Sequence, residues 1–399
     1  MIAWKRNIIF IMAAQFFSMM AFSFAMPFVP FYLQEMGVRN SHELKVWITL
    51  FNFTAPLAFA VCAPIWGAVS DRYGRRLMLL RASFGGVIVL FLMGLAANPS
   101  MLVGLRLLQG VLTGTMTAAQ TMVSVHAPEN RSGFALGLLS AAVASGNTTG
   151  AFFGGLFADS FGYRLAFVAG SGLMLIAGLL VLLGTEEYVS KQQEEDERPQ
   201  RFTLAPRNLG SAGFILSLIA VIGFAITFDM GWLPLLVQEI HGGIRGASFW
   251  TGSLAAVGGI AGFLAGPIIG RLADRITPPT IARISSIGSG FMTILVALSH
   301  HFSLLFCARF CTSFCAGGLD PVFQIWLSKV TPARERGVVF GWASSVRALG
   351  WMCSPLVSGT VAWLAGVRAV FFAAAAFYFL LVPLISFIVR RLEQTRSEI

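Results

Sequence analysis

The stretch WGAVSDRYGRRLMLL, which runs from Trp66 to Leu80, places a cluster of charges between two runs of apolar residues. Its four charged side chains lie within six consecutive positions: Asp71, Arg72, Arg75 and Arg76. Charges inside the hydrocarbon layer of a membrane are costly, so a cluster of them belongs at its edge. We therefore interpret the stretch as a short polar loop that joins two membrane-spanning helices.

The composition of the whole chain supports this interpretation. Of its 399 residues, 56% are hydrophobic and 12% are charged, whereas a soluble domain carries about 25% charged residues. Apolar runs recur at roughly 20 residues, the length that a helix needs to cross the hydrocarbon layer. We predict an all-α membrane protein with twelve transmembrane helices, at about 7–34, 46–70, 76–97, 100–125, 132–158, 164–185, 209–237, 249–271, 279–299, 303–329, 336–363 and 368–390.

Basic residues are distributed unevenly between the two ends of these spans. A small group falls on the side away from the chain termini: Arg39, Lys45, Arg164, Arg245 and Arg368. Apart from three arginines inside spans, the other lysines and arginines lie on the side of the termini, which the positive-inside rule assigns to the cytoplasm. The net charge of +10 therefore reflects membrane topology, and we expect no nucleic-acid partner.

A polar segment divides the spans into two groups of six. Residues 186–202 read EEYVSKQQEEDERPQRF, a strongly charged run interrupted by Pro199. Such a run is typical of a solvated linker. The sequence predicts an N-terminal six-helix bundle over 1–185, a cytoplasmic linker over 186–208 and a C-terminal six-helix bundle over 209–399.

The two halves repeat each other at an offset of 203 to 204 residues. FAMPFVPFYLQE (24–35) recurs as FDMGWLPLLVQE (228–239), and FGYRLAF (161–167) recurs as AGVRAVF (365–371). Arg106 in LVGLRLLQG corresponds to Arg309 in LLFCARFCTS. Internal duplication of this kind is common in transporters, which bind substrate between the repeats near the middle of the membrane. We therefore expect two pseudo-symmetric bundles.

The charged loop has a counterpart in the second half, formed by Gly270, Asp274 and Arg275. The pattern Gly-x-x-x-Asp-Arg-x-Gly-Arg-Arg resembles the signature loop of the major facilitator superfamily, and the first copy is complete: Gly67, Asp71, Arg72, Gly74, Arg75 and Arg76. The resemblance implies a cytoplasmic latch that holds the two halves together in one conformation. The alternative is that the arginines only anchor the topology.

The fifth predicted span is rich in glycine, at Gly137, Gly146, Gly150, Gly154 and Gly155. These spacings resemble the helix signature of the drug–proton antiporters of that superfamily, although Ala151 stands where the signature has proline. The resemblance implies a 12-helix multidrug exporter. The alternative is ordinary packing of small residues between helices.

Five charged residues inside spans are candidates for proton coupling: Asp229, Asp320, Arg106, Arg309 and Arg347. Arg106, followed by Gln109 and Gly110, resembles a family signature associated with proton transfer. The two acids can each accept a proton, and Asp229 has no intramembrane cation near it in sequence, so coupling or binding of a cationic substrate is expected there. For Asp320 the alternative is a fixed ion pair with Arg347.

Polar, aromatic and methionine side chains on the helices expected to face the substrate give adaptable contacts for varied compounds. The candidates are Met26, Phe31, Asn52, Gln120, Phe228, Trp232, Phe323 and Gln324. With 36 Phe and 15 Met in the chain, the alternative for any one of them is contact with lipid or with the bundle core.

The sequence thus favours a secondary active transporter, not an enzyme, that exports hydrophobic or amphipathic compounds in exchange for protons by alternating access. The alternatives are a sugar or small-metabolite exporter or importer on the same fold, and a membrane sensor that transports nothing. We expect no cofactor and no metal, since no ligand set completes the cysteines at 307, 311 and 315. A monomer with both termini in the cytoplasm of a bacterial inner membrane is expected.

Overall fold

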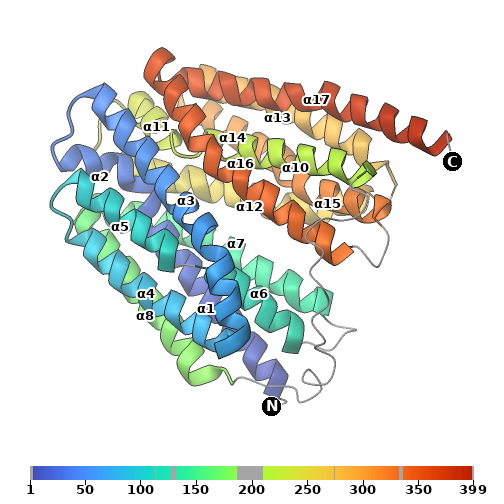
Figure 1. Ribbon diagram of the computed structural model, residues 1–399. Helices are drawn as coiled ribbons and strands as arrows, with labels where there is room; N and C mark the ends of the chain where they lie inside the picture. The colour runs from blue at the N-terminus through green and yellow to red at the C-terminus, as the bar shows by residue number, and fades with distance from the viewer. Residues whose placement is uncertain are drawn as a thin grey trace. The chain divides into compact units, whose positions relative to one another are not determined.

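The computed structural model describes residues 3–112, 114–126, 132–186, 210–273, 275–331 and 336–397, and all of its regular elements are helices (Figure 1). Within these residues, ten helical segments are long and apolar enough to cross a membrane. Two further predicted spans also correspond to helices. The span at 100–125 corresponds to α5 (Pro99–Leu112) with α6 (Thr115–His126), and the span at 132–158 corresponds to α7 (Ser132–Phe161). The prediction of an all-helical membrane protein is confirmed, while the linker from 187 to 208 lies outside the described residues.

The chain divides into two compact units, residues 1–200 with 243–256 and residues 201–242 with 257–399. This division differs from the predicted domain boundaries in one respect, because the beginning of α12 (Ala247–Ala273) groups with the first unit. The first unit contains α1 (Ala3–Ala25), η1 (Met26–Phe28), α2 (Val29–Glu35), α3 (Ser41–Tyr73), α4 (Arg75–Gly94), α5 (Pro99–Leu112), α6 (Thr115–His126), α7 (Ser132–Phe161) and α8 (Tyr163–Gly184).

The second unit begins with α10 and holds most of α12. Its helices are α10 (Gly210–Phe228), α11 (Leu233–His241), α12 (Ala247–Ala273), α13 (Pro278–Leu298), α14 (Phe302–Gly317), α15 (Leu319–Val330), α16 (Arg336–Ala365) and α17 (Val367–Ser397).

The first span of each unit is broken, which the sequence analysis did not predict. In the first unit, α1 ends at Ala25 and a 3₁₀ turn precedes α2, with prolines near the start of both short elements. In the second unit, α10 ends at Phe228 and a turn leads into α11, which also has a proline in its first turn. Because proline has no backbone N–H, it is best tolerated where a helix begins.

Equivalent helices pack in the same way within each unit. In the first unit α1 packs on α7 and α8, and α4 packs on α8; in the second, α10 packs on α16 and α17, and α13 packs on α17. Each unit also has its own apolar core, which includes Ile11, Leu79 and Val181 in the first and Ile219, Phe323 and Leu381 in the second. The repeat seen in the sequence is therefore also a repeat of helix packing.

Candidate functional site

Asp229 and Arg309 form a buried ion pair in the second unit. Asp229 is the first residue of the turn that follows α10, and its side chain has 6% of its surface exposed. Arg309, on α14, donates from Nη1 to Asp229 Oδ2 at 2.6 Å. No intramembrane cation lies near Asp229 in the sequence. In the folded chain, however, Arg309 contacts it from 80 positions further along.

The second acid, Asp320, pairs with Arg347 as the alternative interpretation predicted. Arg347 on α16 contacts both carboxylate oxygens of Asp320 on α15, each at 3.0 Å. Gln324, one turn later on α15, donates Nε2 to Asp320 Oδ2 at 2.9 Å. A fork of this kind fixes the carboxylate by two parallel hydrogen bonds. Gln324 was predicted to contact substrate, and its amide nitrogen is already engaged in this hydrogen bond.

Arg106 differs from the other two intramembrane arginines in its partners. Its Nη1 donates to Gln109 Oε1 at 2.5 Å and to the sulfur of Met26 at 3.2 Å. Its guanidinium also lies over the ring of Phe51, with the central carbon 4.7 Å from the ring centroid. Within the described part of the chain, no carboxylate forms an ion pair with Arg106.

The predicted cytoplasmic loop contains a tight turn at Gly74. This residue ends α3 and precedes α4 with a φ of +92°, a conformation that favours glycine. The side chains of Asp71 and Arg72 and the Cα environments of Gly67 and Gly270 lie outside the described residues, as does Asp274 entirely. In the second copy of the loop, Arg275 is exposed. The turn at Gly74 agrees with the sequence analysis. The contacts of the Asp71 side chain lie outside the described part of the structure.

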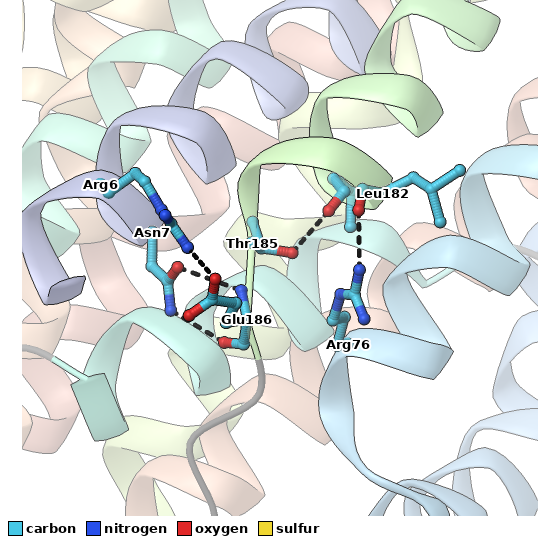
Figure 2. A network of polar contacts seen from close by, with 7 residues as sticks. Arg6, Asn7, Arg76, Leu182, Thr185 and Glu186 are labelled. Atoms are coloured by element: carbon cyan, nitrogen blue, oxygen red, sulfur yellow. Dashed lines mark hydrogen bonds and ion pairs between the residues drawn. The ribbon is translucent and has the colours of Figure 1, made fainter.

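Arg76 from this loop forms a hydrogen bond inside the first unit. Figure 2 shows its guanidinium directed at the end of α8, where Nη2 donates to the carbonyl of Leu182 at 2.7 Å. Close by, Asn7 both donates to the carbonyl of Glu186 at 2.9 Å and accepts from its amide at 3.2 Å. Arg6 pairs with the Glu186 carboxylate. These contacts satisfy backbone groups at the end of α8 and connect it to α1 and α4.

The glycines of α7 allow its close approach to α1. A Cβ atom built on Gly146, Gly150 or Gly154 would overlap the backbone of Phe16, Met20 or Phe24, respectively. Gly137, by contrast, has nothing within 4 Å of such an atom. Three glycines at intervals of four residues thus form one contact face, which is the small-residue packing that the alternative interpretation described.

The end of α7 also contacts the beginning of α12 within the first unit, and the sequence analysis missed this contact. Asp159 Oδ2 accepts a hydrogen bond from the backbone amide of Phe249 at 2.7 Å. The hydroxyls of Tyr163 and Ser248 lie 3.1 Å apart, and a Cβ on Gly155 would overlap the carbonyl of Ser248. Asp159 therefore caps a helix that begins 88 positions later in the sequence.

The predicted substrate-facing residues divide into two groups. Those with less than 3% of their surface exposed are Phe31, Phe228, Trp232 and Phe323. They pack inside their units, where Phe31 lies beside Tyr163 and Trp232 donates to Ser358 at 3.0 Å. Met26, Asn52 and Gln324 are half-buried and Gln120 is exposed, so these four have free surface for other contacts.

The sequence of the chain matches that of the Major Facilitator Superfamily over residues 11–288 and 250–398. It is 35% identical over 378 residues to the Multidrug resistance protein MdtG of Serratia proteamaculans (strain 568), covering 94% of this chain and 92% of that protein. The protein of the same name from Proteus mirabilis (strain HI4320) is 33% identical over 391 residues, or 96% of each chain.

The fold is similar to that of a bacterial homolog of the human lysosomal transporter Spinster, whose crystal structure is in an inward-facing and occupied conformation. The TM-score is 0.78 at 15% sequence identity, and the match covers 97% of this chain and 96% of that one. Together with the broken first spans, the repeated packing and the intramembrane charges, these matches identify the chain: it belongs to the Major Facilitator Superfamily, a family of multi-pass membrane transporters.

Proposed function

We propose that the chain is a secondary transporter that exports hydrophobic or amphipathic compounds in exchange for protons. The observation that carries the export of such compounds is the likeness, over nearly the whole chain, to proteins named for multidrug resistance. The chain lies in a bacterial inner membrane with both termini in the cytoplasm, as the distribution of its basic residues supports. It works as a monomer, because one chain supplies both repeats.

Asp229 is the coupling acid in this proposal. The Asp229 carboxylate is buried and has Arg309 as its counter-charge, and breaking a buried pair of this kind is costly. When a proton binds to Asp229, the attraction to Arg309 is lost and the guanidinium must find another acceptor. Because Asp229 lies at the break between α10 and α11, a change in this pair acts directly on the joint between two helical segments.

Asp320 and Arg347 form a second coupling candidate. This pair joins α15 to α16, and its side chains are more exposed than those of Asp229 and Arg309, at 30% and 21%. Since exposure reduces the energetic consequence of adding a proton, we assign Asp320 the secondary role. Protonation would still release Gln324 and Arg347 together, because both bind the same carboxylate oxygen.

Alternating access by two bundles supplies the conformational cycle. The loop that contains Gly67, Asp71, Arg72, Gly74, Arg75 and Arg76 acts as the cytoplasmic latch, with Gly270, Asp274 and Arg275 as its second copy. Met26, Asn52, Gln120 and Gln324 are retained as substrate contacts because part of their surface is accessible. The domain boundaries near 185 and 209 are retained as well.

The proposal is tested in everted membrane vesicles that hold an acid-inside proton gradient. Addition of a substrate should dissipate the gradient in vesicles with the wild-type protein and not in vesicles without it. Asp229→Asn should abolish this response, and Asp320→Asn should weaken it. Glu43→Gln is a matched control, since it removes a carboxyl group from an exposed position at the start of α3.

The outcomes separate the alternatives. Transport of a compound with no proton movement would replace antiport by facilitated diffusion, and the sugar or metabolite carrier would then be favoured. Loss of the response in Glu43→Gln as well as in Asp229→Asn would show that any removed carboxyl group impairs the protein, and would contradict the role of Asp229.

A further inference from the structure

Asn147 is an exposed carboxamide in the middle of a membrane-spanning helix. It lies on α7, fifteen residues after the first and fourteen before the last, so about 20 Å of helix separates it from either end. Lipid at this depth offers no hydrogen-bond partner, and polar side chains inside spans therefore face protein or a water-filled cavity. The exposed surface of Asn147 thus belongs to a side of the helix that lipid does not cover.

The other residues of α7 show which side of the helix faces lipid. Leu138 and Leu156 are apolar and have 39% and 47% of their surface exposed. Each lies nine positions from Asn147, which is two and a half turns and places them on the opposite side of the helix. Ala151 lies one turn after Asn147 on the same side, and it packs against Gly252 of α12. Asn147 therefore lies on the face of α7 that contacts protein, and it remains exposed there.

One end of the Asn147 amide is already hydrogen-bonded. Ser23, on α1, donates its hydroxyl to Asn147 Oδ1 at 2.8 Å. The amide nitrogen, Nδ2, carries two N–H donors, and among the described residues it has no acceptor. The hydrogen bond from Ser23 fixes the amide in place. The pair thus presents free donors, and neither member carries a charge.

An apolar side chain lies beside this pair. Met19 lies one turn before Ser23 on α1, and it approaches α7 so closely that a Cβ atom on Gly146 would lie 3.2 Å from its own Cβ. Met19 is half-buried, and a thioether side chain adapts to partners of different shape. A ligand with an uncharged hydrogen-bond acceptor on an apolar body would complement both the free donors and the methionine.

The second unit shows that helix packing does not require an amide at this position. Gly350 approaches the backbone of Ala220 as Gly146 approaches that of Phe16, and the two contacts are related by the repeat offset of 204 positions. The residue after Gly350 is Trp351, which has 46% of its surface exposed. Since the second unit packs in the same way with an indole here, the carboxamide of the first unit has a role other than packing.

We propose that Asn147, held in place by Ser23, donates a hydrogen bond from Nδ2 to an uncharged acceptor of the transported compound, such as a carbonyl oxygen. Asn147 is thereby a specificity-determining residue, which the sequence analysis did not include among the substrate contacts. This inference rests on the proposed export function and adds a recognition element to it.

The test compares two fluorescent probes that differ at one carbon atom. Prodan is a dimethylaminonaphthalene with a propionyl group and therefore carries a ketone, whereas its propyl analogue has a methylene group in place of the carbonyl. Binding is measured by fluorescence titration of the full-length protein in nanodiscs of zwitterionic lipid, with empty nanodiscs as the reference. Asn147→Leu should weaken binding of the ketone about fivefold, as expected for one hydrogen bond between neutral groups. It should leave binding of the propyl analogue unchanged.

Two further variants separate a ligand contact from a contact between helices. Ser23→Ala breaks the same hydrogen bond between α1 and α7 as Asn147→Leu does, but it leaves Nδ2 in place and should retain most of the affinity for the ketone. Thr148→Val is the matched control at the next position, because the Thr148 hydroxyl bonds the carbonyl of Ala144 within α7. It should change neither affinity. If Asn147→Leu does not fold, the smaller substitution Asn147→Ala takes its place.

The emission of the bound ketone gives a second readout that helix packing alone would not change. Prodan emits at longer wavelength when its carbonyl accepts a hydrogen bond. The emission maximum should therefore move to shorter wavelength in Asn147→Leu and stay at the wild-type position in Thr148→Val.

The inference is overturned if Asn147→Leu leaves the affinity for the ketone unchanged or weakens both probes equally. It is also overturned if Ser23→Ala weakens the ketone as much as Asn147→Leu, because the amide would then act only through the contact between α1 and α7. Failure of the proposed export function has a different readout. In everted vesicles, the absence of any substrate-induced proton movement would reject proton-coupled export even if the binding results are as expected. A proton response to tetraphenylphosphonium, with unchanged ketone binding in Asn147→Leu, would keep the export function and reject the role of Asn147.

Discussion

Arg309 and Asp229 form the more deeply buried of the two intramembrane ion pairs among the described residues, with 13% and 6% of their side-chain surface exposed, against 21% and 30% for Arg347 and Asp320. Attraction between charges is stronger, and loss of one partner more costly, where water is excluded. Removing a charge from the Asp229–Arg309 pair should therefore reduce the stability of the protein more than removing one from the Asp320–Arg347 pair.

Removal of the Asp229 charge alone should destabilise the protein more than removal of the whole pair. Asp229→Asn leaves Arg309 buried without a counter-charge, which costs about 3–5 kcal/mol. The double variant Asp229→Asn with Arg309→Gln removes both charges and should recover part of that loss. Thermal unfolding of the purified protein measures both. Equal melting temperatures for the single and double variants would contradict this prediction.

Asp320→Asn serves as the comparison within the same unit. Because both side chains of its ion pair retain partial exposure, Arg347 can contact water after the charge is removed. The expected fall in melting temperature is smaller than for Asp229→Asn. A fall as large as that of Asp229→Asn would show that burial does not determine the ranking.

Substitution of alanine for the glycines of α7 should change stability in opposite directions along one helix. Gly154→Ala places a methyl group against the carbonyl of Phe24, so α7 must move away from α1. Gly137→Ala meets no atom within 4 Å and should stabilise the helix by about 0.5–1 kcal/mol, since alanine loses less backbone entropy than glycine. Comparison of melting temperatures tests this, and stabilisation by Gly154→Ala would be incompatible with the packing described.

The turn at Gly74 should not tolerate a side chain. With φ of +92° and ψ of +156°, it lies in a region that is essentially restricted to glycine, so Gly74→Ala should cost about 1–3 kcal/mol. Gly104→Ala is the matched control, because Gly104 lies inside α5 with nothing within 4 Å of a Cβ position. Urea unfolding of the two variants in detergent gives the comparison, with a similar midpoint for both as the contrary result.

The cap that Asp159 provides for α12 should depend on its acceptor oxygen. Asp159→Leu removes the acceptor for the Phe249 amide and should cost about 1 kcal/mol, the usual value of a helix N-cap. Asp159→Asn retains one acceptor oxygen and should lose less. Hydrogen exchange of the Phe249 amide measures the effect locally. Unchanged protection in Asp159→Leu would refute the capping role.

Much of the fold could be predicted because membrane insertion depends on simple periodic properties. Apolar runs of sufficient length gave the spans, and the match between FAMPFVPFYLQE and FDMGWLPLLVQE gave the repeat, which the packing in each unit confirms. The breaks after Ala25 and Phe228 were not predicted, although Pro27, Pro30 and Pro234 were signals for them. Hydropathy alone cannot detect a break that leaves the segment apolar.

The site was less accessible to sequence reasoning because its contacts join distant helices. The pairing of Asp320 with Arg347 was foreseen as an alternative, since the two lie on consecutive predicted spans. The partner of Asp229 was missed, although the repeat contained the information needed to find it. Arg309 corresponds to Arg106 in the repeat. Each arginine contacts the residue that lies 80 positions before it, which is Asp229 for Arg309 and Met26 for Arg106. Comparison of the two copies, residue by residue, would have shown which arginine lacks an acid.

The origin of the α12 cap has a consequence for how the protein is made. Asp159 precedes the amide it binds by 90 positions, so the ribosome completes the acceptor well before the donor emerges. When α12 enters the membrane, α7 can already be in place and ready to receive its first turn. A circularly permuted chain that began at residue 243 would reverse this order. The Phe249 amide at the start of α12 would then lack its acceptor until α7, which carries Asp159, had been synthesised.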